Sequence, residues 1–363
     1  MSTQIEVKEP IKLLNKDGSL TQPGWAKRNI IEYNREDIRA SKWAVKEWDF
    51  YQVGCKDFIV QFNFFNISLA SAATIGYVNL KTGEVVNDMI LDLANKFPVN
   101  RNGEEPYTFE RKKGKKVLRF EVTKEKRHLY WKSPKIECDF WADNYTGESI
   151  VIMNPFEKHA NHFFFTEKIN CMPTRGFVKI GSEVIDGNRD DLFTVLDWGR
   201  GVWDHKNYWF WGNGTTYIDG KLFGFEITWG IGAPEKGRET ALMYDGKCHK
   251  LGEVYLEYQP DKRWMDPWKL HEENGRLCVR VELQVRLVYL RNGKIRSEYQ
   301  KDTLTLCRND RVMKLDSGIQ VIKCPQCNAN IDVTKGECEY CGTKIDSVQE
   351  WELKVSRIEN EVT

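Results

Sequence analysis

The stretch Val279-Arg-Val-Glu-Leu-Gln-Val-Arg-Leu287 alternates apolar and polar residues without interruption. Such alternation is typical of a β-strand with one buried face and one face in water. The dipeptide Asn292-Gly293 follows, and a second extended stretch runs from Ile295 to Leu306. Because Asn-Gly favours the type I′ turn, the sequence predicts a β-hairpin here.

The same signals recur along most of the chain. Further Asp-Gly or Asn-Gly turns begin at Asp17, Asn102, Asp186, Asn213, Asp219, Asp245 and Asn274. Extended stretches are predicted over Phe58–Asn66, Thr74–Leu80, Val117–Thr123, Ser149–Asn154 and Leu222–Thr228. Short helical segments are expected only over Val86–Ala94 and Asp190–Leu196. The pattern lacks a βαβ rhythm and phosphate-binding glycine motifs, so it predicts an all-β barrel or sandwich.

Composition narrows the range of functions. The 363 residues carry a net charge of +1, so we do not expect a nucleic-acid partner. Thirteen tryptophans in a chain with a mean hydropathy of −0.57 indicate a folded protein. The sequence has no apolar run that predicts a transmembrane segment, and its first twenty residues do not resemble a signal peptide. We therefore expect a cytoplasmic protein whose ten cysteines are free thiols or metal ligands.

Two Cys-x-x-Cys pairs near the C-terminus form the most specific motif. They are separated by ten residues and consist of Cys324, Cys327, Cys338 and Cys341. Four thiolates at this spacing predict a structural zinc site, although chance pairs or a redox dithiol are alternatives. The segment resembles bacterial zinc ribbons, which implies a role in assembly or partner contact. We place the main body at residues 1–310, the ribbon at 320–346 and a charged tail at 347–363.

A dense aromatic block occupies Leu196–Gly214. The pattern predicts a pocket with ring walls and polar anchors, formed by Trp198, Arg200, Trp203, Trp209, Trp211 and Asn213. Asp197, Arg200 and Asp204 are close enough in sequence to form a buried ion network. The alternative is a barrel whose ends are closed by tryptophans and an Arg–Asp pair.

Candidate acid–base groups are His205, Asp204 and Glu226. For Glu226 we expect a solvent-facing position, although a position facing the barrel interior would make it an acid. His159 and His162 have the spacing of metal ligands. With no third ligand in view, we expect a turn that leads into the apolar strand starting at Phe163.

Several segments together resemble the bacterial domain-of-unknown-function 2804 family. They are Leu196–Trp203, Asp219–Glu226, Met243–Cys248, Pro23–Arg28 and Lys46–Tyr51, within a resemblance that covers Ile11 to Leu306. The resemblance implies one or two lipocalin-like antiparallel barrels, with a split near residues 160–175 if there are two. At fold level such barrels are similar to carotenoid hydratases and fungal Diels–Alder cyclases, but fold does not fix function.

Two functional hypotheses follow. The first is a lipocalin-like protein that binds a small apolar or amphipathic ligand. Whether it also catalyses a hydration, isomerisation or cyclisation without a redox cofactor is left open by the sequence. The second is an interaction scaffold that docks a protein partner through the zinc ribbon. A ligand cavity favours the first hypothesis, whereas an interior filled by side chains favours the second.

Overall fold

The computed structural model describes residues 4–93, 99–144, 147–205, 207 and 209–251. Beyond these it describes 278–291, 294–308, 312–314, 320–324, 326–327, 329–332, 338–342 and 351–352. Contacts divide the chain into two units, Met1–Cys248 and His249–Thr363. Strands dominate, and the described residues contain no α-helix, which confirms the all-β prediction. None of the helical segments in the described residues is long and apolar enough to cross a membrane.

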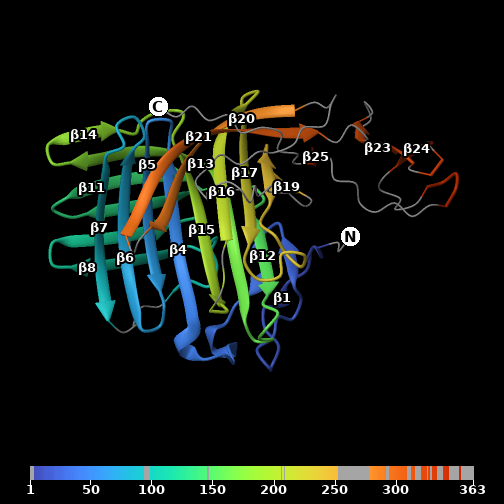
Figure 1. Ribbon diagram of the computed structural model, residues 1–363, viewed down its shortest axis with the longest axis horizontal. Coiled ribbons are helices and arrows are strands. Elements are labelled where there is room, and N and C mark those ends of the chain that lie inside the picture. Colours follow the sequence, from blue (N-terminus) through green and yellow to red (C-terminus); the bar gives the residue numbers. More distant parts are fainter. Residues whose placement is uncertain are drawn as a thin grey trace. The chain divides into compact units, whose positions relative to one another are not determined.

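The first unit is built on one large antiparallel sheet (Figure 1). Its strand order is β7-β6-β5-β4-β15-β13-β11-β10-β9-β8. The bounds are β4 Val45–Gly54, β5 Phe58–Asn66, β6 Ala70–Asn79, β7 Val85–Leu93, β8 Tyr107–Lys113, β9 Lys116–Val122, β10 Lys126–Lys132, β11 Ile136–Asp143, β13 Phe163–Ile180 and β15 Phe193–Val202. Four of the five extended stretches predicted from sequence lie in or overlap β5, β6, β9 and β12 (Ile150–Pro155), and the fifth lies in β17 (Lys221–Gly230).

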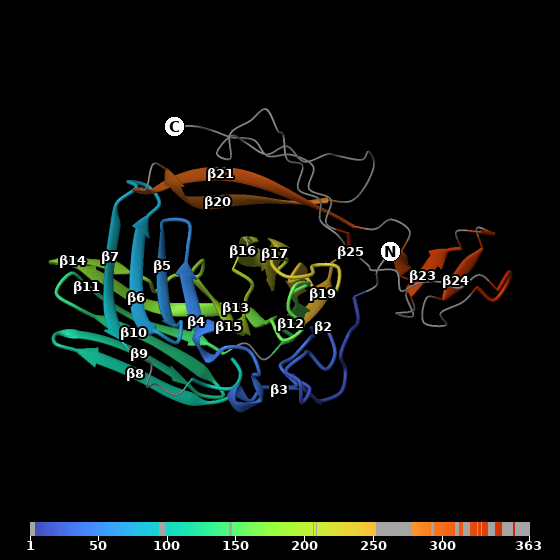
Figure 2. The same cartoon turned by 60° about the horizontal axis from the view of Figure 1, so that its bottom comes forward.

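The sheet curls into a nearly closed barrel whose two end strands, β7 and β8, come close at the left of Figure 2. Side chains join this seam instead of backbone pairing. Arg111 on β8 donates to Asp92 on β7 from Nε at 2.6 Å, and Lys116 Nζ lies 2.5 Å from Asp88 Oδ1. Strands β8 and β9 form the hairpin that carries these basic residues.

Strand β13 connects the barrel to the strands around it. Its first half pairs with β12 (Ile150–Pro155), and its second half pairs with β11 and β14 (Glu183–Asp186). The register against β15 shifts between Ile169 and Met172, where Cys171 has a φ of 63°. A bulge of this kind bends a strand, so one strand serves both halves of the sheet.

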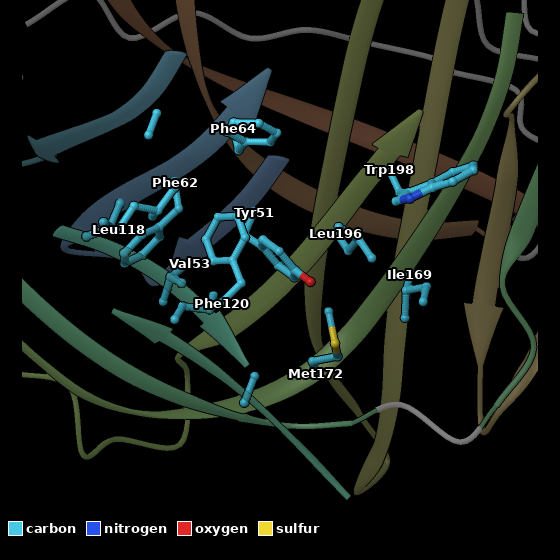
Figure 3. Close-up of a cluster of buried hydrophobic side chains, with 14 of the residues drawn as sticks. Tyr51, Val53, Phe62, Phe64, Leu118, Phe120, Ile169, Met172, Leu196 and Trp198 are labelled. Carbon is cyan, nitrogen blue, oxygen red and sulfur yellow. The ribbon is translucent and has the colours of Figure 1, made fainter. Parts of the chain in front are cut away.

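Large side chains fill the barrel interior. Alternate residues of β4 and β5 point inward, and Figure 3 shows Tyr51, Phe62 and Phe120 packed together with Trp198 farther along. The largest side chains that are almost completely covered are Trp131, Trp198, Arg127, Arg200, Tyr51, Tyr77, Phe58, Phe62, Phe120, Phe140, Phe163 and Phe165. The interior is therefore a packed core.

A second sheet of the first unit has the order β16-β17-β18-β19. It comprises β16 Trp209–Ile218, β17 Lys221–Gly230, β18 Ala241–Tyr244 and β19 Lys247–Lys250, and both β16 and β17 contact β13. Strand β12 pairs with β13 along one edge and with the short strand β2 (Gly24–Ala26) along the other. Strand β1 (Ile11–Lys12) pairs in parallel with β3 (Ile31–Glu32). Two 3₁₀ turns, η1 (Arg35–Asp37) and η2 (Lys42–Ala44), precede β4.

The second unit contains the predicted hairpin. Strands β20 (Cys278–Arg291) and β21 (Lys294–Arg308) pair antiparallel with Arg291 opposite Lys294, while the turn residues 292–293 lie outside the described residues. Strands β22 (Val312–Lys314), β23 (Gln320–Lys323) and β24 (Asn330–Asp332) form a small sheet. The charged tail is described only at β25 (Trp351–Glu352), which pairs with β21.

Both helical expectations are wrong. Val86–Ala94 corresponds to β7, which pairs along its length with β6, and Asp190–Leu196 leads through a turn into β15. In each case the cross-strand partner lies elsewhere in the sequence. Tertiary pairing therefore outweighs the weak local helical signal.

We predict that Gly199→Ala destabilises the first unit by about 1–3 kcal/mol. A Cβ at Gly199 would lie 1.9 Å from a ring carbon of Trp48, which is its partner across β4 and β15. Gly212 on β16 is the matched control, because a Cβ there meets nothing within 4 Å. Urea unfolding of both variants measures the difference, and equal midpoints would contradict the packing described.

Candidate functional site

One row of residues crosses the outer face of the barrel sheet on six adjacent strands. Residues directly opposite one another in a sheet share a face, so these side chains form one continuous surface. In order across β13, β15, β4, β5, β6 and β7, they are Lys168, Asp197, Phe50, Asn63, Thr74 and Met89.

A buried ion cluster lies at the β13 end of this row. Lys168 is only 3% exposed, and its Nζ lies 2.5 Å from Asp197 Oδ1 and 3.2 Å from Glu239 Oε1. Thr228 Oγ1 donates to Glu239 Oε2 at 2.8 Å. Burial alone would lower the pKa of Lys168, but the charges of Asp197 and Glu239 raise it above its ordinary value. The ammonium group is therefore charged and paired.

Glu226 on β17 is completely buried beside this cluster. Trp211 Nε1 donates to its Oε2 at 2.7 Å, and Asn170 Nδ2 donates to its Oε1 at 2.9 Å. Burial raises the pKa of Glu226 to about 8, against the opposing effects of the Trp211 bond and Lys168. The carboxyl is therefore mostly protonated at neutral pH, the form required of a general acid.

The expectation that Glu226 faces solvent is wrong. Every residue from Phe223 to Thr228 is buried, so β17 is covered on both faces. Alternation along the strand shows that Glu226 and Phe225 point to opposite sides, but it does not show that both sides are covered.

Trp211 separates the ion cluster from the rest of the row. Its ring lies edge-on to Phe50 at a centroid distance of 5.9 Å, and Lys168 Nζ lies 4.9 Å from the centroid of the same ring. Trp211 is half-buried, whereas Glu226 behind it is fully covered. Trp211 is thus the half-buried side chain that contacts both Glu226 and Phe50.

An open groove of about 420 Å³ continues the row beyond Phe50. Gly76 leaves space on its floor, and a chain of hydrogen bonds runs beside it from Gln61 to Gln52 (3.5 Å) and from Gln52 to Asn213 (3.2 Å). The groove has both apolar and polar walls. It is lined by Phe50, Gln61, Asn63, Thr74, Ile75, Gly76, Asn87, Asp88, Met89 and Lys135.

Trp198 and Arg200 lie on the opposite side of the sheet, inside the barrel. Arg200 is fully buried, and its Nη2 donates to Asp49 Oδ1 at 2.9 Å and to Asn100 Oδ1 at 2.6 Å. The guanidinium carbon of Arg200 lies 4.2 Å from the centroid of the Trp198 ring. These two side chains are thus engaged in the packed core.

The structure contradicts the expected ion network of Asp197, Arg200 and Asp204. Asp197 and Arg200 are three residues apart on one strand, so they point to opposite faces. Asp204 lies beyond the end of β15, where its Oδ1 is 2.7 Å from Nδ1 of both His159 and His162. Each of the three charges has its own partners.

The remaining residues of the aromatic block lie near the end of β15. Trp203 is half-buried, with ring centroids 5.3 Å from both Trp48 and Trp209. Trp209 is 48% exposed, and His205 is exposed as well. The structure brings Trp211, Asn213 and Glu226 together, but places His205 away from the buried carboxyl group.

Sequence reasoning missed Lys168, Glu239 and Phe50. Lys168 carried a signal, because it closely follows the aromatic stretch Phe163–Phe165, which is typical of a buried strand. A lysine that is buried in a strand requires an anionic partner. Its partner Asp197 became identifiable only through the register of β13 and β15.

The four C-terminal cysteines lie together. Cys324 Sγ is 3.6 Å from Cys341 Sγ, and Cys327 Sγ is 3.6 Å from Cys338 Sγ. Four sulfurs about 2.3 Å from a tetrahedral zinc ion would be roughly 3.8 Å apart, so this donor set fits zinc. Gly342 follows the second pair with a φ of +69°, and its N–H donates to Cys338 O at 2.8 Å, which closes the turn.

Comparisons with known proteins give two solved structures and one family model. The chain is similar to kievitone hydratase from Nectria haematococca (11% identity, TM-score 0.42, 85% of this chain and 89% of that one). It is also similar to a Nitrosomonas europaea protein provisionally assigned as AttH (10% identity, TM-score 0.39, 80% and 91%). No curated protein sequence matches it. The model of the domain of unknown function 2804 matches residues 4–289, and the chain belongs to that family.

Proposed function

We propose that this protein binds a small amphipathic molecule along the row from Asn63 to Lys168 and transfers a proton to or from it through Glu226. The supporting observation is the row itself, because it runs from the open groove to Lys168, beside which Glu226 is buried. Trp211 lies between the groove and Glu226. A cytoplasmic location fits the free thiols, which require reducing conditions.

The chemistry of the groove suggests the class of ligand. Phe50 and Trp211 offer ring faces and edges, while Asn63 and Asn87 offer amide donors and acceptors. A molecule with an apolar ring and a few hydroxyl or carbonyl groups would satisfy both kinds of wall. We propose that Trp211 and Asn213 are the ligand contacts of the aromatic block, because Trp198 and Arg200 are engaged in the core.

Glu226 and the ion cluster suggest the reaction class. A neutral carboxyl can protonate an alkene, enol or leaving hydroxyl group, and a carboxylate can take the proton back. Lys168, flanked by Asp197 and Glu239, would stabilise negative charge that develops nearby. Hydration, isomerisation and cyclisation all use such a proton transfer, and none of them needs a redox cofactor.

The packed interior of the barrel supports a second candidate function. Because large side chains fill it, the protein does not hold its ligand inside this barrel as lipocalins do. A protein that uses the barrel as a rigid body and its cysteine unit to dock a partner would need no cavity. Ligand binding and proton transfer therefore have to be measured separately.

For ligand binding, native mass spectrometry of the freshly purified chain should show a bound small molecule. Thr74→Trp would fill the groove and should reduce the bound fraction at least tenfold. Trp141→Ala is the matched control, because Trp141 is 43% exposed and lies on β11, away from the groove residues. Equal occupancy in both variants would place the ligand elsewhere, and no bound molecule in any preparation would favour the scaffold.

The proton transfer has its own readout. The extracted molecule is returned to the ligand-free chain in D₂O, where the wild type should incorporate deuterium at carbon and Glu226→Gln should not. Incorporation that survives Glu226→Gln would remove the assigned role of this residue. Binding without incorporation in the wild type would reduce the function to transport or storage.

Glu226 should also make stability depend on pH. Its raised pKa means that the folded chain keeps a proton that the unfolded chain releases, so the free energy of unfolding falls between about pH 4.5 and pH 8. Glu226→Gln should remove roughly 2–4 kcal/mol of that fall. Glu167, which is buried inside the barrel with a pKa raised to about 8, offers Glu167→Gln as a comparison. Only Glu226→Gln should abolish deuterium incorporation, and an unchanged pH profile in this variant would contradict the protonated state.

We further propose that the four cysteines bind one structural zinc ion. Cobalt substituted into the full chain should show thiolate-to-metal charge-transfer absorption, and Cys324→Ser should weaken cobalt binding and reduce this absorption without changing the unfolding of the first unit. Cys55→Ser is the control, since Cys55 lies in the first unit. Absence of the band in the wild type would exclude a tetrathiolate site.

A further inference from the structure

A second group of metal-ligating side chains lies at one end of the barrel, where β13 begins and β15 ends. His159 and His162 are in the turn between β12 and β13, and Asp204 follows β15. The backbone brings them together, because Phe163 pairs with Val202 in the antiparallel register of β13 and β15. The three ligand atoms all lie within 4.8 Å of one another.

The contacts converge on one point. His159 Nδ1 and His162 Nδ1 each lie 2.7 Å from the same oxygen, Asp204 Oδ1, and the two ring centroids are 4.3 Å apart. A backbone bond from His162 N to His159 O (2.9 Å) holds the turn that presents both rings. Side-chain exposure is 17% for His162, 11% for Asp204 and 56% for His159, so the group is built into the structure and still reachable from solvent.

The donor atoms suit a cation at this point. A divalent ion can accept lone pairs from two neutral rings and one carboxylate oxygen. Ligands about 2.0 Å from a tetrahedral ion lie roughly 3.3 Å apart, so the group needs to open by only about 0.6 Å. The exposed His159 ring can make that movement.

We propose that His159, His162 and Asp204 form a metal site for a divalent transition-metal ion of the zinc class. Two imidazole nitrogens and one carboxylate oxygen suit zinc, nickel, copper or iron, whereas magnesium and calcium prefer oxygen ligands. Three protein ligands leave at least one coordination position for water or another small ligand. The site is distinct from the four cysteines in both donor type and sequence position. It also does not depend on the function proposed for Glu226.

The site is tested by cobalt titration of the untagged full chain in which Cys324, Cys327, Cys338 and Cys341 are all changed to serine (the four-serine chain), so that none of the four clustered thiolates remains. The chain should bind cobalt with visible ligand-field bands of a nitrogen–oxygen site and without thiolate charge transfer. His159→Ala should weaken cobalt binding at least tenfold. Because His159 is more than half exposed, this variant should fold normally, and thermal unfolding without metal checks that it does.

His128→Ala is the matched control. His128 Nε2 lies 2.9 Å from Asp139 Oδ1 and so forms an ordinary His–Asp pair, and among the described residues this carboxylate belongs to no group of three metal-ligating side chains. Its loss should leave cobalt affinity unchanged. Added zinc should raise the melting temperature of the four-serine chain and should not raise it when His159→Ala is also present. Absence of nitrogen–oxygen cobalt bands, or equal cobalt affinity with and without His159, would overturn the proposal.

Discussion

The buried ammonium group of Lys168 is the constraint on which the arrangement of the first unit depends. A charge that is 3% exposed is tolerated only when anionic groups lie within contact distance. One partner, Asp197, comes from the adjacent strand of the barrel, and the other, Glu239, comes from the segment that precedes β18. The ion cluster therefore fixes the second sheet against the outer face of the barrel. Burial beside this cluster raises the pKa of Glu226, and Lys168 opposes that rise.

The two faces of one strand show how the barrel divides packing from chemistry. On β15, Trp198 and Arg200 point inward, where Arg200 donates to Asp49, Asn100 and two carbonyl oxygens. Such a network orders the core and leaves little capacity for a ligand. Asp197 points outward to a half-buried surface that continues into an open groove. Substitutions of outward-facing residues can thus change the outer face without changing the side chains that pack the core.

Local patterns predicted much of the fold, because alternation and Asn-Gly or Asp-Gly turns depend on neighbouring residues. The hairpin of β20 and β21 and the strand at Phe58–Asn66 are examples. Local patterns could not assign the site, because its pairs are distant in sequence. Lys168 meets Asp197 through strand register, and Asp204 meets His162 only because β15 ends where β13 begins. The third ligand that His159 and His162 lacked in the sequence was 42 residues farther along the chain.

Trp48 connects the ion cluster to the end of the barrel where His162 and Asp204 lie. It fits because Gly199 opposite has no side chain, and its Nε1 donates to Asp197 Oδ1 at 3.0 Å. Its ring stacks on Phe164 at 5.9 Å and lies edge-on to Trp203 at 5.3 Å. Phe164 lies two residues after His162, and Trp203 directly precedes Asp204. The two segments that carry the proposed metal ligands therefore also pack against Trp48, whose indole donates to Asp197. A shift of these segments would consequently move a hydrogen-bond donor of the ion cluster, whereas the Glu226 carboxyl, held by Trp211 and Asn170, would keep its own bonds.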